Sequence, residues 1–253
     1  MSGVGVLVDL TKCMGCRGCQ VACKRWHDLA GEATQFNPEW TNPTSISRDT
    51  WTLIRFVEAE KNGENVWRFV KQQCMHCVNP ACVFVCPTKA MHKADNGYVL
   101  YDENLCIGCR YCVQSCPFDM MRFDYERNRV VQKCTFCFER IEVGLKPACV
   151  ETCPAEALKF YRELDELRRD ADAMKAKGLY VYGVEEVGGT RWVYVSDVPF
   201  DKLGFPKYGA ETPAQLATGL VSQFAAVGLV GGLLVVWLQK YSERRRKKSE
   251  GGG

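Results

Sequence analysis

Sixteen cysteines in this chain of 253 residues fall into four motifs of four, and none is left over. Three of the motifs are followed directly by a proline. Thiolates are soft metal ligands, and several of them within a few residues can surround one compact inorganic group. The cysteines are therefore expected to bind metal. The motifs are Cys13, Cys16, Cys19 and Cys23; Cys74, Cys77, Cys82 and Cys86; Cys106, Cys109, Cys112 and Cys116; and Cys134, Cys137, Cys149 and Cys153.

The third motif has the spacing C-x2-C-x2-C-x3-C-P, which is typical of bacterial ferredoxins. In that pattern three close thiolates hold one [4Fe–4S] cluster and the fourth binds the neighbouring cluster. The first motif lacks only the proline, whereas the second and fourth lengthen one gap. Four such motifs predict four [4Fe–4S] clusters. A chain that binds four clusters is most simply a relay for single electrons.

Zinc and disulfide bonds are the competing uses of these cysteines. Structural zinc takes two separated cysteine pairs, so a third cysteine three residues further on is not needed. Disulfides would require an oxidising compartment, and the even number of cysteines allows them. Cysteines three residues apart in a tight loop nevertheless suit a shared metal group better than eight bridges. The alternative from a different class is a membrane-tethered interaction protein stabilised by zinc.

The fourth cysteine of each motif determines how the motifs pair. If these cysteines cross over, motifs two and three form one unit, which we call the inner unit. Motifs one and four then form the outer unit. The predicted ligand sets are Cys13, Cys16, Cys19 and Cys153 with Cys134, Cys137, Cys149 and Cys23 in the outer unit, and Cys74, Cys77, Cys82 and Cys116 with Cys106, Cys109, Cys112 and Cys86 in the inner unit.

Short elements are expected to position these loops. Alternating or apolar runs before the motifs predict strands at 4–9, 66–70, 98–101 and 129–132. Asn62-Gly63 predicts a hairpin between 51–58 and 66–73. A second hairpin is expected between 180–184 and 191–195, across Gly188-Gly189. A charged helix is expected at 162–177, ended by Gly178.

The fold class predicted from these elements is α+β, with two nested ferredoxin-like units and one C-terminal transmembrane helix. Residues 1–161 would form the four-cluster domain, with an insertion at 28–65 whose Pro-, Asn- and Ser-rich part is expected to face a partner. Residues 162–212 would form a connector of helix and hairpin. The membrane helix would occupy 213–239, and a basic tail 240–253.

The C-terminal region contains 23 residues without a formal charge, 216–238. As a helix they would span roughly 34 Å, enough for a bilayer core, although a buried helix of a soluble domain is the alternative. The basic run 244–248 follows directly. The positive-inside rule therefore predicts a single span in the cytoplasmic membrane, with a cytoplasmic C-terminus and a periplasmic cluster domain. The alternative is a cytoplasmic cluster domain that violates this rule. Because the N-terminus shows no export signal, export would depend on a partner that carries one.

Composition argues against several other functions. The formal net charge of +3 counts every cysteine as neutral, so sixteen thiolates around four doubly charged cores would leave the loaded protein negative. Nothing in this composition indicates a nucleic-acid partner. There are three histidines and no Ser/His/Asp set, Walker loop or dinucleotide fingerprint. The chain is therefore not expected to be an enzyme by itself.

The whole chain resembles the iron–sulfur electron-transfer subunits of respiratory molybdenum or tungsten enzymes. Within that group it is most similar to the beta subunit of membrane-bound formate dehydrogenase. The resemblance rests on the four motifs in order, including the four-residue gap of the second and the eleven-residue gap of the fourth. Local strings such as Lys12-Cys13-Met14-Gly15-Cys16 and Cys74-Met75-His76-Cys77 extend it.

This resemblance implies two protein partners. A molybdopterin-type catalytic subunit would oxidise the substrate, and an integral membrane subunit with cytochrome b or a quinone site would exchange electrons with the clusters. Related subunits serve nickel–iron hydrogenases and sulfur-compound reductases, so the same relay in one of those complexes is the alternative. Since every ligand position is cysteine, four [4Fe–4S] clusters are expected rather than a three-iron variant.

Overall fold

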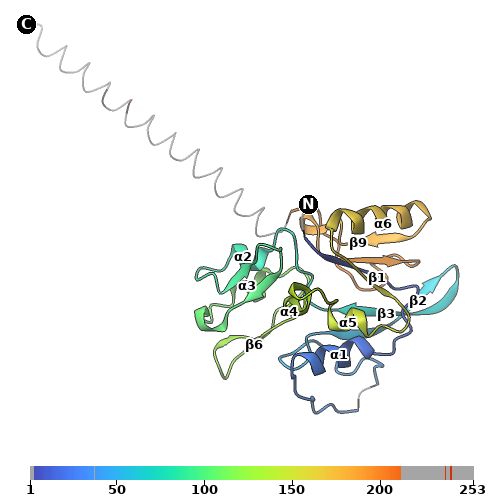
Figure 1. Ribbon diagram of the computed structural model, residues 1–253, viewed down its shortest axis with the longest axis horizontal. Coiled ribbons are helices and arrows are strands. Elements are labelled where there is room, and N and C mark those ends of the chain that lie inside the picture. Colours follow the sequence, from blue (N-terminus) through green and yellow to red (C-terminus); the bar gives the residue numbers. More distant parts are fainter. Residues whose placement is uncertain (1–2, 37, 212–236, 238–239, 241–253) are drawn as a thin grey trace, which may run out of the picture. The chain divides into compact units, whose positions relative to one another are not determined.

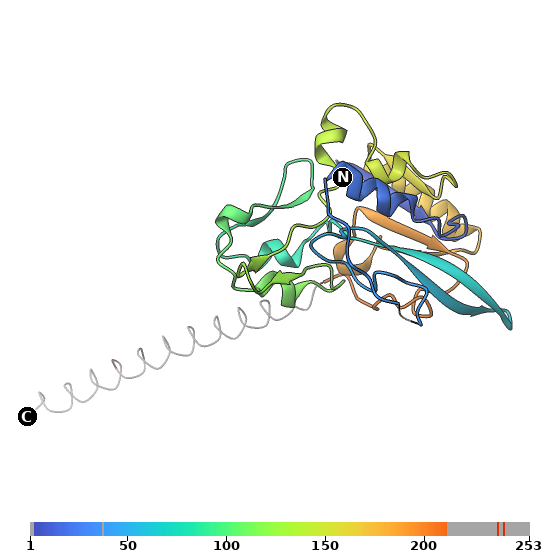
Figure 2. The ribbon, with the colours of Figure 1, turned by 90° about the horizontal axis from the view of Figure 1, so that it is seen from below.

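The computed structural model describes residues 3–36, 38–211, 237 and 240. The chain divides into one compact unit of residues 1–212 and a second of 213–253. The first unit is built from short helices and strands (Figure 1). In both views the inner unit, coloured teal to green, gathers beside the strands coloured orange, dark blue and cyan (Figures 1 and 2).

A four-stranded sheet anchors the first unit. Its central strand β1 pairs with β10 in parallel and with β8 in antiparallel, and β9 pairs with the other edge of β10. Every residue of β1 and β10 is buried, as expected where both faces of a sheet are covered. The strands are β8 (Leu158–Tyr161), β1 (Gly5–Asp9), β10 (Trp192–Ser196) and β9 (Tyr180–Tyr182), in that order across the sheet.

Alternate residues of β1 pack into two different cores. Val6 and Val8 point into the main core, together with residues of the cysteine motifs. Leu7 points to the opposite face, which helix α6 (Leu164–Ala176) covers with Leu167 and Ala171. The helix expected at 162–177 is therefore confirmed, and it contacts β1, β8, β9 and β10.

Residues 162–212, which the sequence separated as a connector, contribute two strands to this sheet. The hairpin expected within them is confirmed, because Tyr182 pairs with Tyr194. Its link is longer than a tight turn at Gly188-Gly189, since it contains the 3-10 helix η2 (Glu186–Gly188). Val6 pairs with Trp192, so the first and last strands of the unit lie side by side. An apolar strand such as β10 must be covered on both faces, which a free connector could not achieve.

The long hairpin predicted around Asn62-Gly63 is also confirmed. Strands β2 (Leu53–Lys61) and β3 (Glu64–Gln72) pair along their whole length. Both turn residues have positive φ, 52° and 82°, which is the conformation of a type I′ turn. The end of β3 leads directly into the second cysteine motif, so the hairpin positions that motif.

The helices of the outer unit are α1 (Gly18–Trp26), α4 (Phe138–Glu142) and α5 (Ala148–Glu151). Two small hairpins and two short helices form the inner unit. The predicted strand at 98–101 appears as β5, and the one at 129–132 is reduced to the two residues of β7. The inner elements are α2 (Ala81–Phe84), β4 (Met91–Lys93), β5 (Val99–Tyr101), the 3-10 helix η1 (Glu103–Leu105), α3 (Tyr111–Ser115), β6 (Phe123–Asp124) and β7 (Arg129–Val130).

The membrane helix predicted at 213–239 and the basic tail at 240–253 fall outside the described residues, apart from Trp237 and Lys240. Across 3–36 and 38–211, no helix has the length and apolar character needed to cross a bilayer.

Candidate iron–sulfur cluster sites

The short helices bring the cysteine motifs together in pairs. In the outer unit α1 carries Cys19 and Cys23, and it contacts α5, which carries Cys149. In the inner unit α2 carries Cys82 and contacts α3, which carries Cys112. Contacts between motifs one and four, and between motifs two and three, agree with the nested pairing that crossover of the fourth cysteines requires.

The first predicted ligand set lines a single cavity. Cys13, Cys16 and Cys19 from motif one meet Cys153 from motif four there. Two cations also line the cavity, the buried Lys71 at the end of β3 and the half-buried Arg17. Among the four thiols Cys19 is buried, Cys13 and Cys153 are half-buried and Cys16 is exposed. The remaining wall is largely apolar. It includes Val8, Met14, Ile54, Ala155, Ala157 and Leu158.

The pKa values of its thiols indicate that the cysteines of the second outer set lie near one another. Burial and the neighbouring Cys149 raise the pKa of Cys23 to about 11. Burial, Cys149 and Cys23 raise the pKa of Cys137 to about 12, although a backbone N–H of Ala148 opposes the rise. Burial and Cys23 also raise the pKa of Cys134 well above its usual range. These four cysteines therefore lie within electrostatic reach of one another.

The inner unit shows the same grouping. Burial, followed by Cys74, Cys116 and Cys82, raises the pKa of Cys77. In the other inner set, burial raises the pKa of Cys112 to about 12, and Cys86, Cys109 and Cys106 add to the rise. These two groups match the inner ligand sets that the sequence predicts, and the sets themselves stay a prediction.

These raised pKa values have one chemical consequence. Buried thiols that face one another cannot all ionise without a cation among them, because the negative charges are both desolvated and mutually repelled. Coordination to a metal deprotonates a thiol outright and supplies that positive charge. The chemistry of the donor sets therefore fits [4Fe–4S] clusters, each held by four cysteines.

Cys106 is the exception, because its thiolate is already stabilised. Burial would raise its pKa, but the neighbouring Tyr101 hydroxyl and backbone N–H groups of Val130 and Gly108 lower it below the usual value. The hydroxyl of Tyr101 is buried and makes no hydrogen bond with the described residues. This unpaired hydroxyl lies beside Cys106, where it can donate to a metal-bound thiolate. Together with the raised thiol pKa values, it indicates that the site fits a thiolate-bound group.

Other hydrogen bonds to sulfur come from backbone and imidazole nitrogens. The N–H of Met91 donates to Cys86 Sγ at 3.4 Å, and that of Met120 donates to Cys116 Sγ at 3.4 Å. Nε2 of His27 lies 3.6 Å from Cys137 Sγ. Burial lowers the pKa of His27 to about 4, so its ring is neutral at pH 7. Such contacts orient ligands and stabilise the more negative, reduced form of a cluster.

All sixteen cysteines are free thiols in the structure. Among the described residues, no three or more His, Cys, Asp or Glu side chains are arranged as ligands of a single metal ion. A [4Fe–4S] cluster makes a different demand, because each of its four thiolates binds a different iron and the sulfurs therefore stand further apart.

Lys71 is a functional residue that motif reasoning missed. Its side chain is only 2% exposed. Burial alone would lower its pKa, but the thiols of Cys149, Cys19 and Cys134 outweigh burial, and the pKa ends above its usual value. Nothing in the local sequence marks it, because it lies at the end of an ordinary alternating strand, three residues before Cys74.

His76 and Lys133 connect the inner unit to the outer unit. His76, between two inner ligands, accepts a hydrogen bond from the Val99 N–H at Nδ1, 3.1 Å away. Its Nε2–H therefore donates to the carbonyl oxygen of Cys134 in the outer unit, at 3.0 Å. Lys133 donates to the same carbonyl at 3.1 Å. The His76 ring is therefore bonded to backbone groups on both sides.

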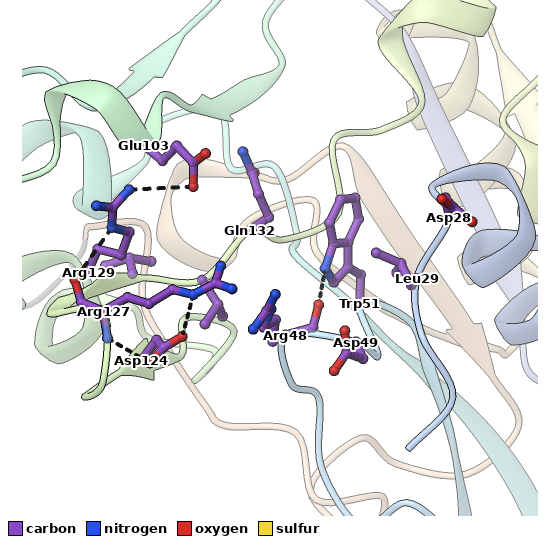
Figure 3. A pocket seen from close by; sticks show the side chains of 12 residues that line it. Asp28, Leu29, Arg48, Asp49, Trp51, Glu103, Asp124, Arg127, Arg129 and Gln132 are labelled. Atoms are coloured by element: carbon purple, nitrogen blue, oxygen red, sulfur yellow. Dashed lines mark hydrogen bonds and ion pairs between the residues drawn. The ribbon is translucent and has the colours of Figure 1, made fainter. Parts of the chain in front are cut away.

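A separate pocket of about 230 Å³ lies where the insertion meets β7 (Figure 3). Its charged side chains largely pair with one another: Arg129 lies 3.8 Å from Glu103, and Arg127 lies 3.7 Å from Asp124. The Trp51 indole donates to the Arg48 carbonyl oxygen at 2.8 Å (Figure 3). None of the lining residues is a cysteine, so this pocket is distinct from the predicted cluster sites.

Comparison with known proteins agrees with the site chemistry. Two models of 4Fe-4S dicluster domains match residues 12–90 and 65–163. The chain is 40% identical over 238 residues to the iron-sulfur subunit of the nitrate-inducible formate dehydrogenase of Escherichia coli K12, covering 90% of this chain and 81% of that protein. It is 36% identical to the formate dehydrogenase iron-sulfur subunit of Haemophilus influenzae, covering 94% and 80%. It is also 32% identical to the hydrogenase-2 operon protein HybA of Escherichia coli O157:H7, covering 92% and 80%.

The nested motifs and the dicluster matches define the class of protein, an electron-transfer protein that binds multiple [4Fe–4S] clusters. The chain belongs to the family of formate dehydrogenase iron–sulfur subunits. Members of this family are electron-transfer subunits and not catalytic ones, so the chain works within an oxidoreductase complex.

Proposed function

We propose that the chain relays electrons between a catalytic subunit that carries molybdenum or tungsten, with formate as its substrate, and a membrane subunit that carries cytochrome b or a quinone site. The observation that carries this proposal is the single cavity that Cys13, Cys16 and Cys19 of motif one form with Cys153 of motif four, which supports four sets that are each completed by the partner motif. The ligand sets are those predicted: Cys13, Cys16, Cys19 and Cys153; Cys134, Cys137, Cys149 and Cys23; Cys74, Cys77, Cys82 and Cys116; and Cys106, Cys109, Cys112 and Cys86.

When bound, the four clusters supply one-electron transfer. The residues of the chain hold them and control their surroundings. Apolar side chains such as Ile54 and Leu158 line the cavity of the first outer set and lower the polarity around it. The Tyr101 hydroxyl and the N–H groups of Met91 and Met120 place positive dipoles on inner thiolates. Both effects set the potential at which each site accepts an electron.

The proposed complex is attached to the cytoplasmic membrane through residues 213–239, with the cluster domain in the periplasm and the basic tail in the cytoplasm. The support is the uncharged run 216–238 followed by arginines and lysines. Fusions test this arrangement. Alkaline phosphatase fused after residue 253 should be inactive and green fluorescent protein at the same place fluorescent, whereas the opposite pattern would reject the orientation.

Purification of the native complex through this chain tests the central proposal. We expect about sixteen irons per chain, at four per cluster, together with molybdenum or tungsten. Formate should then reduce the clusters in the purified complex, as seen by electron paramagnetic resonance (EPR). A colourless, zinc-loaded preparation would reject the relay altogether.

A hydrogenase complex is the second candidate, and the similarity to HybA supports it. The same preparation would then contain nickel in place of molybdenum or tungsten, and hydrogen instead of formate would reduce the clusters. That result would leave the relay in place and replace only its catalytic partner.

A further inference from the structure

Lys71 places a positive charge inside the outer unit. The ammonium lies 4.4 Å from the centre of the Trp192 ring and donates a hydrogen bond to Gln73 Oε1 at 2.9 Å. Trp192 and Gln73 are both completely buried. The contacts that hold this ammonium are therefore a neutral amide and an aromatic face, both of them buried.

A closed network keeps the side chain in place. Gln73 Nε2 donates to the Tyr194 hydroxyl at 2.7 Å, and that hydroxyl donates to the backbone carbonyl oxygen of Lys71 at 2.8 Å. The network joins β3 to β10 across the core. Because every member is buried and bonded, the position of the charge is determined by the fold rather than by a flexible side chain.

The charge faces both candidate cluster sites of the outer unit. Lys71 lines the cavity formed by Cys13, Cys16, Cys19 and Cys153. Toward the other outer set, the Trp192 ring that the ammonium contacts packs against Phe136, with ring centres 5.2 Å apart, and Phe136 lies between the ligands Cys134 and Cys137. In the inner unit the lysine that acts on Cys82 is a different residue, Lys133.

Burying such a charge requires a negative partner. Transfer of an ammonium into a protein interior costs several kcal/mol unless an opposite charge offsets the lost hydration. Neither Gln73 nor Trp192 provides a formal charge. The thiolates do, because four of them outweigh the positive charge of the core that they hold, and an added electron increases the excess. Lys71 is thus placed to interact more strongly with the reduced form of either outer cluster.

We propose that Lys71 is a positioning residue for electron transfer, whose single buried ammonium raises the reduction potentials of both outer clusters together. The inference rests on the ligand sets proposed above. It assigns a shared electrostatic role to one residue that binds no iron. It also separates the two units, because the inner clusters lie outside the sites that this lysine lines.

Redox titration of the purified complex, monitored by EPR, tests the proposal. The outer and inner signals are first assigned with Cys16→Ser and Cys109→Ser. In Lys71→Met, which keeps the side-chain volume and removes the charge, the ratio of reduced to oxidised cluster at a given potential should fall at least tenfold for both outer clusters. For a one-electron couple, tenfold corresponds to about 59 mV. Both inner clusters should change by less than threefold.

Two controls accompany this variant. Lys71→Arg keeps the charge and should leave the outer ratios within threefold of the wild-type values. Lys175→Met removes an exposed lysine of α6 that pairs with Glu185, and it should change none of the four signals. Outer clusters that do not move in Lys71→Met, or four clusters that move equally, would overturn the proposal.

Loss of iron is treated as a separate outcome. If Lys71→Met and Lys71→Gln both fail to retain clusters, Lys71 is needed for assembly, and its proposed role in setting potentials is rejected. Failure of the relay itself would be recognised in the wild-type complex. There, an iron content far below about sixteen per chain would reject the ligand sets independently of any Lys71 variant.

Discussion

The outer unit holds its cysteines against a sheet made from distant parts of the chain, whereas the inner unit holds them between local hairpins. Residues of β1 and β10 pack in the same core as Cys19, Cys134 and Cys149. Of the inner ligands, Cys82, Cys86, Cys106 and Cys112 pack instead with a smaller core that includes Met91, Val99 and Val130, whereas Cys74 and Cys77 pack in the main core and Cys116 packs against both. The same type of cluster is therefore expected in two different packing environments.

The electrostatic settings differ as well. In the outer unit a full charge, the Lys71 ammonium, lines the cavity of one ligand set and contacts Trp192, which packs against Phe136 between two ligands of the other set. At Cys106 in the inner unit the compensation comes mainly from dipoles, namely the Tyr101 hydroxyl and two backbone N–H groups, with a smaller contribution from the charge of Arg129. A charge acts over a longer range than a hydrogen bond, so it can influence two sites at once. The comparison teaches that motifs with nearly identical spacing can be tuned jointly in one unit and separately in the other.

Removal of one ligand from each unit should have the largest effect. Cys109→Ser should eliminate one inner cluster, at a cost of about four irons per chain, because serine is a poor substitute for a soft thiolate. Cys16→Ser is the matched outer variant. Iron analysis and EPR should show the signals of the other unit intact in each case. Unchanged iron content in Cys109→Ser would reject its assignment as a ligand.

Gly15 and Gly108 occupy the same place in motifs one and three. Substitutions at these two positions therefore allow a direct comparison of the outer and inner cysteine loops. Both have positive φ, 69° and 72°. A Cβ at Gly108 would lie 2.3 Å from the backbone oxygen of Asn128, whereas at Gly15 it would meet the Phe69 side chain at 2.7 Å. A ring can move more readily than backbone. Gly108→Ala should therefore destabilise the protein by about 2–4 kcal/mol, and Gly15→Ala by about 1–3 kcal/mol.

Thermal loss of the visible cluster absorbance, assigned to each unit by EPR, measures the difference. Gly108→Ala should release the inner clusters first. Equal sensitivity of the two variants would show that the close approach of the Asn128 backbone does not restrict the inner loop.

Asp197 tests the outer unit alone. It follows β10 and accepts hydrogen bonds from Arg68 at 2.7 and 2.5 Å and from Lys61 at 2.7 Å. These bonds attach the β2–β3 hairpin to the end of β10. The Arg68 hydrogen bonds, reinforced by Lys61, hold its pKa well below the usual range. Asp197→Asn should cost about 1–2 kcal/mol at pH 7, between the values for exposed and buried pairs.

The pH dependence of this contribution follows from the lowered pKa. An aspartate in an unfolded chain titrates near 3.9, so the stabilisation is complete above about pH 5. It is lost as the pH falls through the lower native value. Urea unfolding followed by cluster absorbance should show a smaller loss of stability in acid for Asp197→Asn than for the wild type. Glu185→Gln, which breaks an exposed pair 3.7 Å long, is the control and should behave as the wild type.

Tyr101→Phe should have the smallest effect. Loss of its hydroxyl removes a dipole beside Cys106 that favours the reduced cluster, so one inner potential should fall. The shift should be a fraction of the roughly 1.5–3 kcal/mol that a hydrogen bond to a charged group contributes. EPR titration measures it. Tyr161→Phe, whose hydroxyl donates to Asp170, is the control and should leave the potentials unchanged. A shift of the outer clusters in Tyr101→Phe would contradict the separation of the two units.

Local patterns predicted local structure well. The alternation around Asn62-Gly63 led to the correct hairpin, because a turn with positive φ at both central residues depends on those residues alone. The charged helix ended by Gly178 was equally local. The parallel pairing of β1 with β10 was not predicted, since the two strands are separated by most of the chain and neither strand's sequence specifies the strand with which it pairs. For the same reason residues 162–212 were separated from the unit to which they contribute two strands.

By itself, the sequence determined the chemistry of this protein: sixteen cysteines with ferredoxin spacing, and the crossover rule that sorts them into four sets. Ligand spacing is a covalent property of the chain, so no tertiary information is needed to recognise it. Only the tertiary structure decided the surroundings of each set, because burial, a buried cation and orphan donors arise where distant segments meet. The role proposed for Lys71 depends on the packing of β3 against β10 and the outer motifs. The role of Tyr101 depends on the position of β5 beside Cys106.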